Sequence, residues 1–173
     1  MIHIFGAKGN IKDIDHFLKE ILNLTDEYNI VIQAMDADWI YGKNHLISAI
    51  NHAKRAFRQK NNSTNSLSME ILLYTSGERQ IQKAIKNIGV KKGKGNIAFV
   101  FTNKDNCEIE KISEDAIKKV LTIFDLKQDD KVLEGDSNTL KKFGITKNEL
   151  NTLPESKYGD IILEKVAMVD VIK

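Results

Sequence analysis

Short apolar runs alternate with longer segments of helical periodicity along the chain, and this alternation limits the possible folds more than any other feature. The compact runs 2–5, 30–35 and 96–102 predict strands. Apolar residues at helical spacing predict helices over 14–28, 43–60, 67–74, 78–88, 114–124, 137–143 and 160–170. Strands interleaved with helices indicate an α/β (α+β) fold, in which several helices cover a small sheet. The length of 173 residues and the 42% hydrophobic content fit a single domain over 1–173.

Glycines and polar clusters predict where these elements are interrupted. Residues 6–9 predict a turn between a strand and a helix. Residues 61–66 are all polar and predict a loop, the expected flexible point of the chain. Gly77 and Gly89 are expected to end the two helices before them in the left-handed conformation. Ser76 is expected to cap the helix that follows it.

No set of residues assembles a recognisable catalytic, cofactor or metal site. Residues 89–95 hold glycine and lysine but lack the spacing and the Ser or Thr of a Walker phosphate loop. His45 and His52 share a helical face, yet no nearby acid or cysteine completes a metal site, so ordinary, partly exposed histidines are favoured. Asp36 and Asp38 could hold Mg²⁺, but a turn at a strand end is favoured. The chain is therefore predicted to be no enzyme and to need no cofactor.

Cysteine usage and hydropathy favour a cytoplasmic protein without a membrane segment. Cys107 is the only cysteine, so no internal disulfide can form, as is usual in a reducing compartment. Its acidic neighbours Asp105 and Glu108 would not activate its thiol. The apolar runs are far shorter than the ~20 residues that span a bilayer, and residues 1–5 show no signal-peptide pattern.

Positive charge is concentrated in the central third of the chain. The net charge of the whole chain is only +2, but residues 41–95 carry eleven Lys or Arg and only two acidic residues. The segments on either side are acidic overall. Charge alone leaves two interpretations open. The basic face either binds a polyanion such as a nucleic acid or is only solvated.

The basic residues recur at helical spacing on two of the expected helices. In the helix over 43–60 the basic face consists of Lys54, Arg55 and Arg58, and in the helix over 78–88 it consists of Arg79, Lys83 and Lys86. Arginine offers a planar fork to phosphate and a face on which a base can stack. The two helices could therefore line a phosphate-binding surface, to which Gln80, Gln82 and Asn51 could add hydrogen bonds to base edges.

Two segments are apolar on nearly all sides. They are residues 69–77 and 161–169. Such a helix is either buried in its own core or presents part of its surface to another protein. The first segment is expected to be buried, and the second raises the same question.

The central motif resembles a known family. Residues 70–85, EILLYTSGERQIQKAI, followed by Gly89 and Val90, resemble the signature of the small regulatory subunit of the KEOPS (EKC) complex, a family that includes the PRPK-binding protein. Residues 45–53 and 163–170 resemble the helix before the motif and the closing helix of the family, although the family often has Arg where Lys165 stands. The resemblance covers nearly the whole chain and suggests an archaeal member.

The resemblance implies a function in tRNA modification. KEOPS makes threonylcarbamoyladenosine in tRNA, with a metal-dependent transferase subunit and an atypical kinase that acts as an ATPase. The regulatory subunit binds and stimulates the kinase, and it recruits tRNA through the CCA 3′ end. The implied fold is a small α/β domain with a mixed sheet. On this basis, Ser76, Gly77 and Gln80 are expected near the terminal bases. Charge alone suggests that phosphates are bound by Lys54, Arg55, Arg58, Arg79, Lys83 and Lys86. The alternative is a pure protein-interaction module without RNA contact.

Overall fold

Four antiparallel strands form the sheet at the centre of the fold. A computed structural model describes residues 1–104 and 114–172. The strands β1 (Ile2–Ile11), β2 (Ile30–Asp36), β3 (Gly93–Asn103) and β4 (Lys127–Gln128) lie in the order β2-β3-β1-β4. The α/β (α+β) class is confirmed. The expected mixed pairing is corrected, because β3 lies between β1 and β2 and pairs antiparallel with both, so no parallel pair forms among the described strands.

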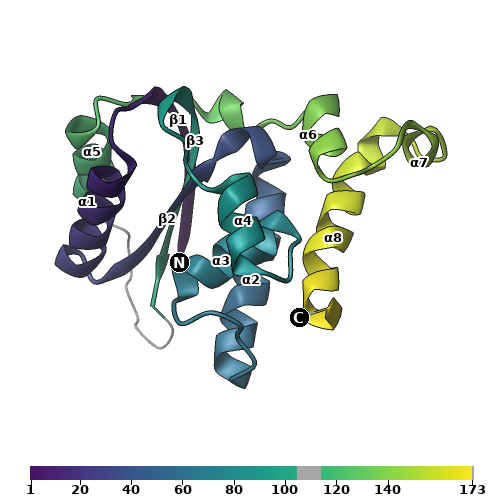
Figure 1. Cartoon of the computed structure of the whole chain (residues 1–173), viewed down its shortest axis with the longest axis horizontal. Coiled ribbons are helices and arrows are strands. Elements are labelled where there is room, and N and C mark those ends of the chain that lie inside the picture. The colour runs from purple at the N-terminus through teal and green to yellow at the C-terminus, as the bar shows by residue number, and fades with distance from the viewer. Residues whose placement is uncertain (105–113, 173) are drawn as a thin grey trace.

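Helices cover both faces of this sheet (Figure 1). On one face, α1 (Ile14–Glu27) and α5 (Glu114–Ile123) pack over the aromatic side chains of β1 and β3. On the other face lie α2 (Gly42–Gln59), α3 (Leu67–Ser76), α4 (Ile81–Ile88) and α8 (Tyr158–Ile172). The short α6 (Ser137–Lys142) and α7 (Lys147–Asn151) precede α8. Every predicted helix forms within a few residues of its expected bounds. None of the described helices is both long and apolar enough to cross a membrane.

The alternation of side chains along β1 and β3 divides the core into two clusters. Phe5 and Phe99 are directly opposite each other, and their stacked rings lie 5.0 Å apart on the side of α1 and α5. Ile4 and Val100, one residue along each strand, face α2 and α3. Because successive side chains of a strand point to opposite faces, the continuous apolar runs seen in the sequence are those of a sheet buried on both faces.

Residues 6–9 continue β1, so the predicted turn is wrong. Gly6 pairs with Ala98, and Gly9 pairs with Gly95. A Cβ at Gly6 would overlap Val132 and the backbone oxygen of Asp129, so glycine is required here for close packing and not for a turn.

A buried carboxylate anchors the polar loop that had been expected as the flexible point. Glu70 of α3 is fully buried. It accepts hydrogen bonds from the backbone N–H groups of Ser63 and Thr64 at 2.9–3.1 Å, and from the Thr64 hydroxyl at 2.8 Å. The loop over 61–66 is therefore tied to the helix that follows it, because a buried carboxylate must find donors.

The ends of α3 and α4 confirm one capping prediction and correct two. Gly77 has a φ of 67° and ends α3 in the left-handed conformation, as predicted. Gly89 ends α4 in an extended conformation instead, and glycine is needed there because a Cβ would overlap the backbone carbonyl of Ile85. Gln80, not Ser76, is the residue that precedes α4. The Ser76 hydroxyl donates to the Leu73 carbonyl instead.

Candidate nucleic-acid and partner interfaces

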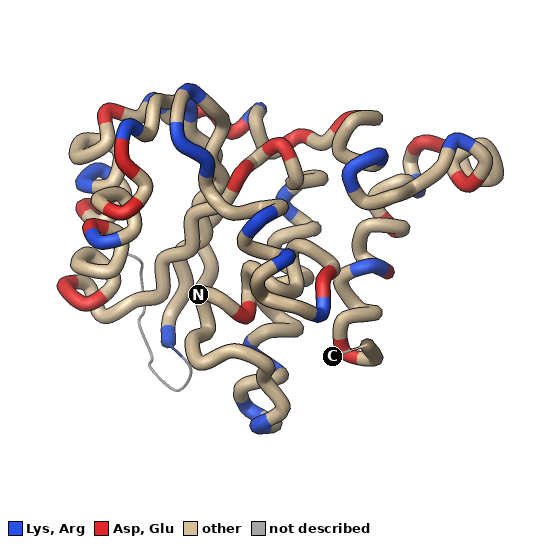
Figure 2. The backbone as a smooth tube through the Cα atoms, in the orientation of Figure 1, with Lys and Arg blue, Asp and Glu red and all other residues tan. Residues whose placement is uncertain are grey.

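The outer face of α4 and the turn before it present exposed cations. Arg79, Lys83 and Lys86 are exposed, whereas Ala84 and Ile88 on the inner side of the helix are buried. Within 1–104 and 114–172, none of these three side chains takes part in an ion pair or a hydrogen bond. Figure 2 shows the corresponding blue segments along α4. Unpaired, exposed cations on one short helix create a positive potential that an anionic partner can use.

The first turn of α4 adds backbone donors to this surface. The residue before the helix, Gln80, is exposed and makes no side-chain capping bond, and the first turn has no acidic residue. The first N–H groups of a helix have no partner within the helix. Such groups favour phosphates and other anions.

The predicted basic residues of α2 are placed differently from those of α4. Lys54 is half-buried and donates to Asn103 at 2.7 Å, and Arg55 binds Asp170 of α8. Only Arg58 projects from the helix without a hydrogen bond or ion pair to any described residue. Helix α3 packs against both α2 and α4 and thus links the two basic surfaces. Two of the three α2 cations already have internal partners.

Ser76, Gly77 and Gln80 lie at or beside the turn between α3 and α4, which approaches α8 at Gly77. Ser76 is buried, and its hydroxyl, besides donating to Leu73, accepts from the N–H of Glu78 at 3.2 Å. A Cβ at Gly77 would lie 3.6 Å from the Cβ of Lys165, so the turn lies against α8. Gln80 and the backbone are therefore the groups of this turn that a base could reach most directly.

His45 is a structural residue of the core. Its side chain is buried, and its Nε2 donates to the Thr75 carbonyl at 2.9 Å while its Nδ1 accepts from the N–H of Tyr41 at 3.2 Å. Burial lowers the pKa of His45 to about 4, so the ring is neutral at physiological pH. The expectation of a partly exposed histidine is wrong at this position, because the ring fills the space between α2 and α3 and is satisfied by backbone groups.

Side chains from three helices meet on the carboxylate of Asp170, and we call this group the Asp170 cluster. It consists of His52 and Arg55 from α2, Tyr74 from α3 and Asp170 from α8. Tyr74 donates to Oδ1, and Arg55 binds Oδ2, which lies 2.7 Å from Nδ1 of His52. Burial alone would raise the pKa of Asp170, but the hydrogen bonds it accepts outweigh burial and lower the pKa. Sequence analysis missed this cluster, although one acid near the end of an apolar helix is a usable signal.

The outer face of α8 exposes apolar side chains toward its C-terminal end, beyond Glu164. Its inner face is completely buried, with Val166 and Val169 in the core cluster of α2 and α3 and Ile162 packed against Leu140 and Ile145. On the outer side, Met168 is 43% exposed and Val171 is 73% exposed. A helix that is apolar on both sides but buried on one presents a surface suited to another protein.

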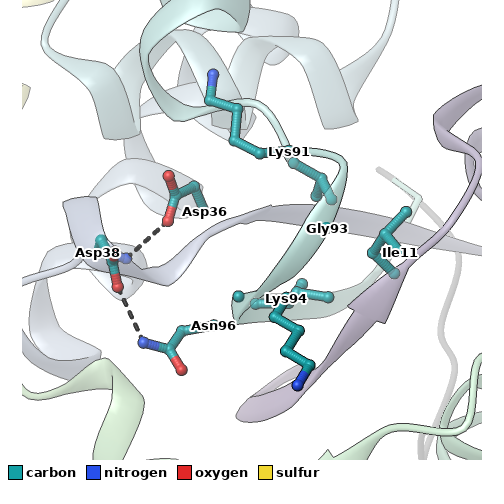
Figure 3. Close-up of a pocket in the computed structure, with 10 residues that line it drawn as sticks. Ile11, Asp36, Asp38, Lys91, Gly93, Lys94 and Asn96 are labelled. Carbon is teal, nitrogen blue, oxygen red and sulfur yellow. Dashed lines mark hydrogen bonds between the residues drawn. The ribbon is translucent and has the colours of Figure 1, made fainter.

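Asp36 and Asp38 form the predicted turn at the end of β2. Asp36 accepts from the N–H of Asp38, and Asp38 accepts from the side-chain amide of Asn96, each at 3.0 Å (Figure 3). Lys91 and other residues complete a small hollow of about 160 Å³ around them. No group of three or more metal-ligating side chains occurs in the described part of the chain. Cys107 and its acidic neighbours lie outside the described residues.

The comparison with known families assigns the chain to one of them. A sequence model of a family described as the kinase-binding protein CGI-121 matches residues 9–170. The chain belongs to this family. The match extends from β1 to Asp170, so it includes α4 and α8 except the last two residues of α8, Val171 and Ile172.

A curated relative agrees with this assignment. The chain is 31% identical over 154 residues to a protein of Methanocaldococcus jannaschii named regulatory protein Cgi121, and the match covers 89% of this chain and 90% of the relative. Similarity over nearly the full length of both proteins supports the assignment of the whole chain to this family.

Proposed function

We propose that this protein is the non-catalytic regulatory subunit of a cytoplasmic KEOPS complex. It binds the atypical kinase/ATPase subunit, stimulates it, and recruits tRNA by its CCA 3′ end for threonylcarbamoyladenosine modification. It reaches the transferase subunit through the kinase. The family description as a kinase-binding protein and the relative's name as a regulatory protein support this proposal. The observation that carries it is the exposed apolar outer face of α8, beside a core that is already complete.

The kinase binds the outer face of α8. Met168, Val171 and Ile172 are 40–73% exposed, while the residues of the inner face are buried. Burying such side chains in an interface stabilises a complex by roughly 25 cal/mol per Å² of apolar area, before the cost of association. Exposed apolar side chains also occur on α1, where Leu18 and Leu22 are 47% and 63% exposed on the opposite side of the sheet.

Introduction of negative charge by replacement with glutamate tests this assignment. Met168→Glu with Val171→Glu is expected to weaken kinase binding at least a hundredfold, because a buried, unpaired carboxylate is costly in an interface. Leu18→Glu with Leu22→Glu is the matched control, since it makes the same change on equally exposed residues of α1. Isothermal titration calorimetry with the purified kinase measures both. Loss of binding in the α1 variant alone would place the interface on α1.

The tRNA 3′ end binds the face of α4 and the turn before it. Three unpaired cations and an uncapped first turn are suited to phosphates, and Arg79 and Gln80 lie at the entrance of the helix. A single-stranded end needs basic grooves and stacking surfaces, not a helix inserted into a duplex groove. The two lysines of α4 and the arginine of the turn before it present this chemistry on one exposed surface.

A gel-shift titration tests the RNA assignment. The isolated protein is titrated onto intact tRNA and onto the same tRNA without its CCA end, at two salt concentrations. We expect binding that is lost on trimming. Arg79→Glu with Lys83→Glu should weaken binding more than tenfold and flatten its salt dependence, because about two phosphate contacts are removed. Lys19→Glu with Lys118→Glu, on α1 and α5, is the matched charge control and should bind as well as the wild type.

A second candidate function is a protein-interaction module without RNA contact. Lys54 and Arg55, two of the residues expected to contact phosphates, bind Asn103 and Asp170 instead, and this observation favours it. The same titration separates the two functions. Wild-type protein that binds neither RNA would establish the interaction module and leave the kinase as the partner to test.

A further inference from the structure

Arg55 belongs to two surfaces at once. It lies on the basic side of α2, and its guanidinium is bound by Asp170 on the helix that presents the apolar outer face. The Arg55 side chain is still 46% exposed, so a phosphate can approach it from solvent. A carboxylate that already holds a guanidinium neutralises the charge that would attract that phosphate.

Asp170 also fixes the last turn of α8. It is followed directly by Val171 and Ile172, the exposed apolar residues at the end of the described chain. The buried Tyr74 donates to one carboxylate oxygen of Asp170, and α2 supplies the groups on the other. Helix ends fray unless side chains hold them. The position of the exposed apolar residues at the end of α8 therefore depends on the hydrogen bonds and the ion pair that Asp170 makes with α2 and α3.

His52 supports either arrangement of this cluster. Its Nδ1 lies 2.7 Å from Oδ2 of Asp170 and 2.7 Å from Nη2 of Arg55. The ring also packs against Tyr74, with 5.5 Å between ring centroids. When Arg55 leaves, His52 remains on α2 as a hydrogen-bond partner of the carboxylate, so the cluster loosens without coming apart.

We propose that Asp170 couples the two binding surfaces, because it holds the end of α8 for the kinase and holds Arg55 back from RNA. This inference rests on the function proposed above and adds its regulation. Asp170 and Arg55 are positioning residues in this scheme. A phosphate that takes Arg55 removes one partner from Asp170 and loosens the end of α8, so RNA and kinase weaken each other's binding to this subunit. Such coupling is reciprocal by linkage.

The test compares Asp170→Asn with Asp160→Asn. Both variants remove one negative charge from α8, but Asp160 lies in its first turn, beside Lys157 and far from the cluster. The RNA probe is a single-stranded oligonucleotide that ends in CCA, and fluorescence anisotropy measures its binding. Asp170→Asn should bind it roughly threefold tighter than the wild type, since Arg55 is released from an ion pair. Asp160→Asn should change this affinity little.

The double variant separates the release of Arg55 from a general charge effect. Asp170→Asn with Arg55→Gln should bind RNA no better than Arg55→Gln alone. Asp170→Asn should also bind the kinase about fivefold more weakly than the wild type, because the end of α8 is in its binding position less often. Thermal unfolding checks that each variant is folded, and asparagine keeps an acceptor for the Tyr74 hydroxyl.

The coupling itself is measured with all components present. Saturating kinase should weaken binding of the oligonucleotide to the wild type more than to Asp170→Asn. Equal effects of Asp170→Asn and Asp160→Asn on RNA affinity, or tighter binding that persists in the double variant, would overturn the coupling alone. Wild-type protein that binds no RNA would overturn the proposed recruitment of tRNA, and the coupling with it.

Discussion

The two faces of the sheet are built from different chemistry. The side covered by α1 and α5 is an apolar cluster in which aromatic rings from helix and strand pack together, as Phe17 does against Phe99 and Phe124. The side covered by α2, α3, α4 and α8 also buries polar groups, including His45 and Glu70. The polar side is the side that carries both proposed binding surfaces.

The two sides contribute differently to folding stability and to the positioning of the helices. Apolar packing is tolerant of exchange and supplies most of the free energy of folding. Buried polar groups are costly unless each donor and acceptor has a partner, so they allow fewer arrangements of the segments that they join. Glu70 fixes the loop before α3, and His45 fixes α2 against the end of α3. The binding surfaces therefore rest on helices whose positions are set by specific hydrogen bonds.

Phe17→Ala is expected to have the largest effect and to act only through stability. Loss of this buried ring should reduce the free energy of unfolding by about 4 kcal/mol, from lost burial and the cavity left behind. Urea denaturation measures the change. Affinity for the kinase should stay as in the wild type under conditions where the variant is folded. A specific loss of kinase binding would break the division between the two sides.

Glu70→Ala is expected to act more locally. The change leaves the buried donors of Thr64 and the partly buried N–H of Ser63 without their carboxylate acceptor, and it should reduce the free energy of unfolding by about 3 kcal/mol. Limited proteolysis should also cut residues 61–66 much faster than in the wild type. Phe17→Ala serves as the comparison here, because at equal fraction folded it should leave this loop protected. Unchanged cleavage would show that Glu70 does not anchor the loop.

His45 makes the stability of the polar side dependent on pH. Its pKa is about 4 in the folded protein and ~6.5 in the unfolded chain. The unfolded chain therefore binds a proton between these values that the folded protein does not, so stability is complete above pH 6.5 and falls as the pH drops toward 4. The expected loss is about 3 kcal/mol. Urea titrations at pH 7 and pH 4.5 should show it in the wild type, and His45→Gln should lose most of the dependence. An equal dependence in that variant would assign the effect to other groups.

The sequence predicts elements well where the signal is local. Helical periodicity and the compact strand runs were sufficient for α1, α2, β2 and the end of α3 at Gly77, because burial of one face and left-handed capping depend on neighbouring residues. The exposed cations of α4 also followed from spacing. The antiparallel order of the strands did not, because pairing is decided by contacts between distant segments.

The partners of charged side chains could not be predicted from spacing. Arg55 is on the basic side of α2 as expected, but its partner Asp170 is 115 residues away in the chain. Glu70 looked like an ordinary acid in an apolar helix, and only the fold brings the loop donors to it. Periodicity assigns a residue to a helix face, and it says nothing about which distant group that face meets.

Substitution of glycines in β1 and β3 is expected to change the free energy of unfolding least, and it compares two sites in the same sheet. Gly6 was predicted to lie in a turn, yet Gly6 and Gly95 both lie in paired strands. A Cβ at Gly6 would overlap Val132 and the backbone of Asp129, whereas a Cβ at Gly95 would meet nothing within 4 Å. Gly6→Ala should therefore cost about 2 kcal/mol in the free energy of unfolding, and Gly95→Ala should be neutral or slightly stabilising. Urea denaturation of both variants measures this difference. Equal losses would mean that backbone conformation, and not the approach of residues 129–132 to β1, makes glycine necessary in this sheet.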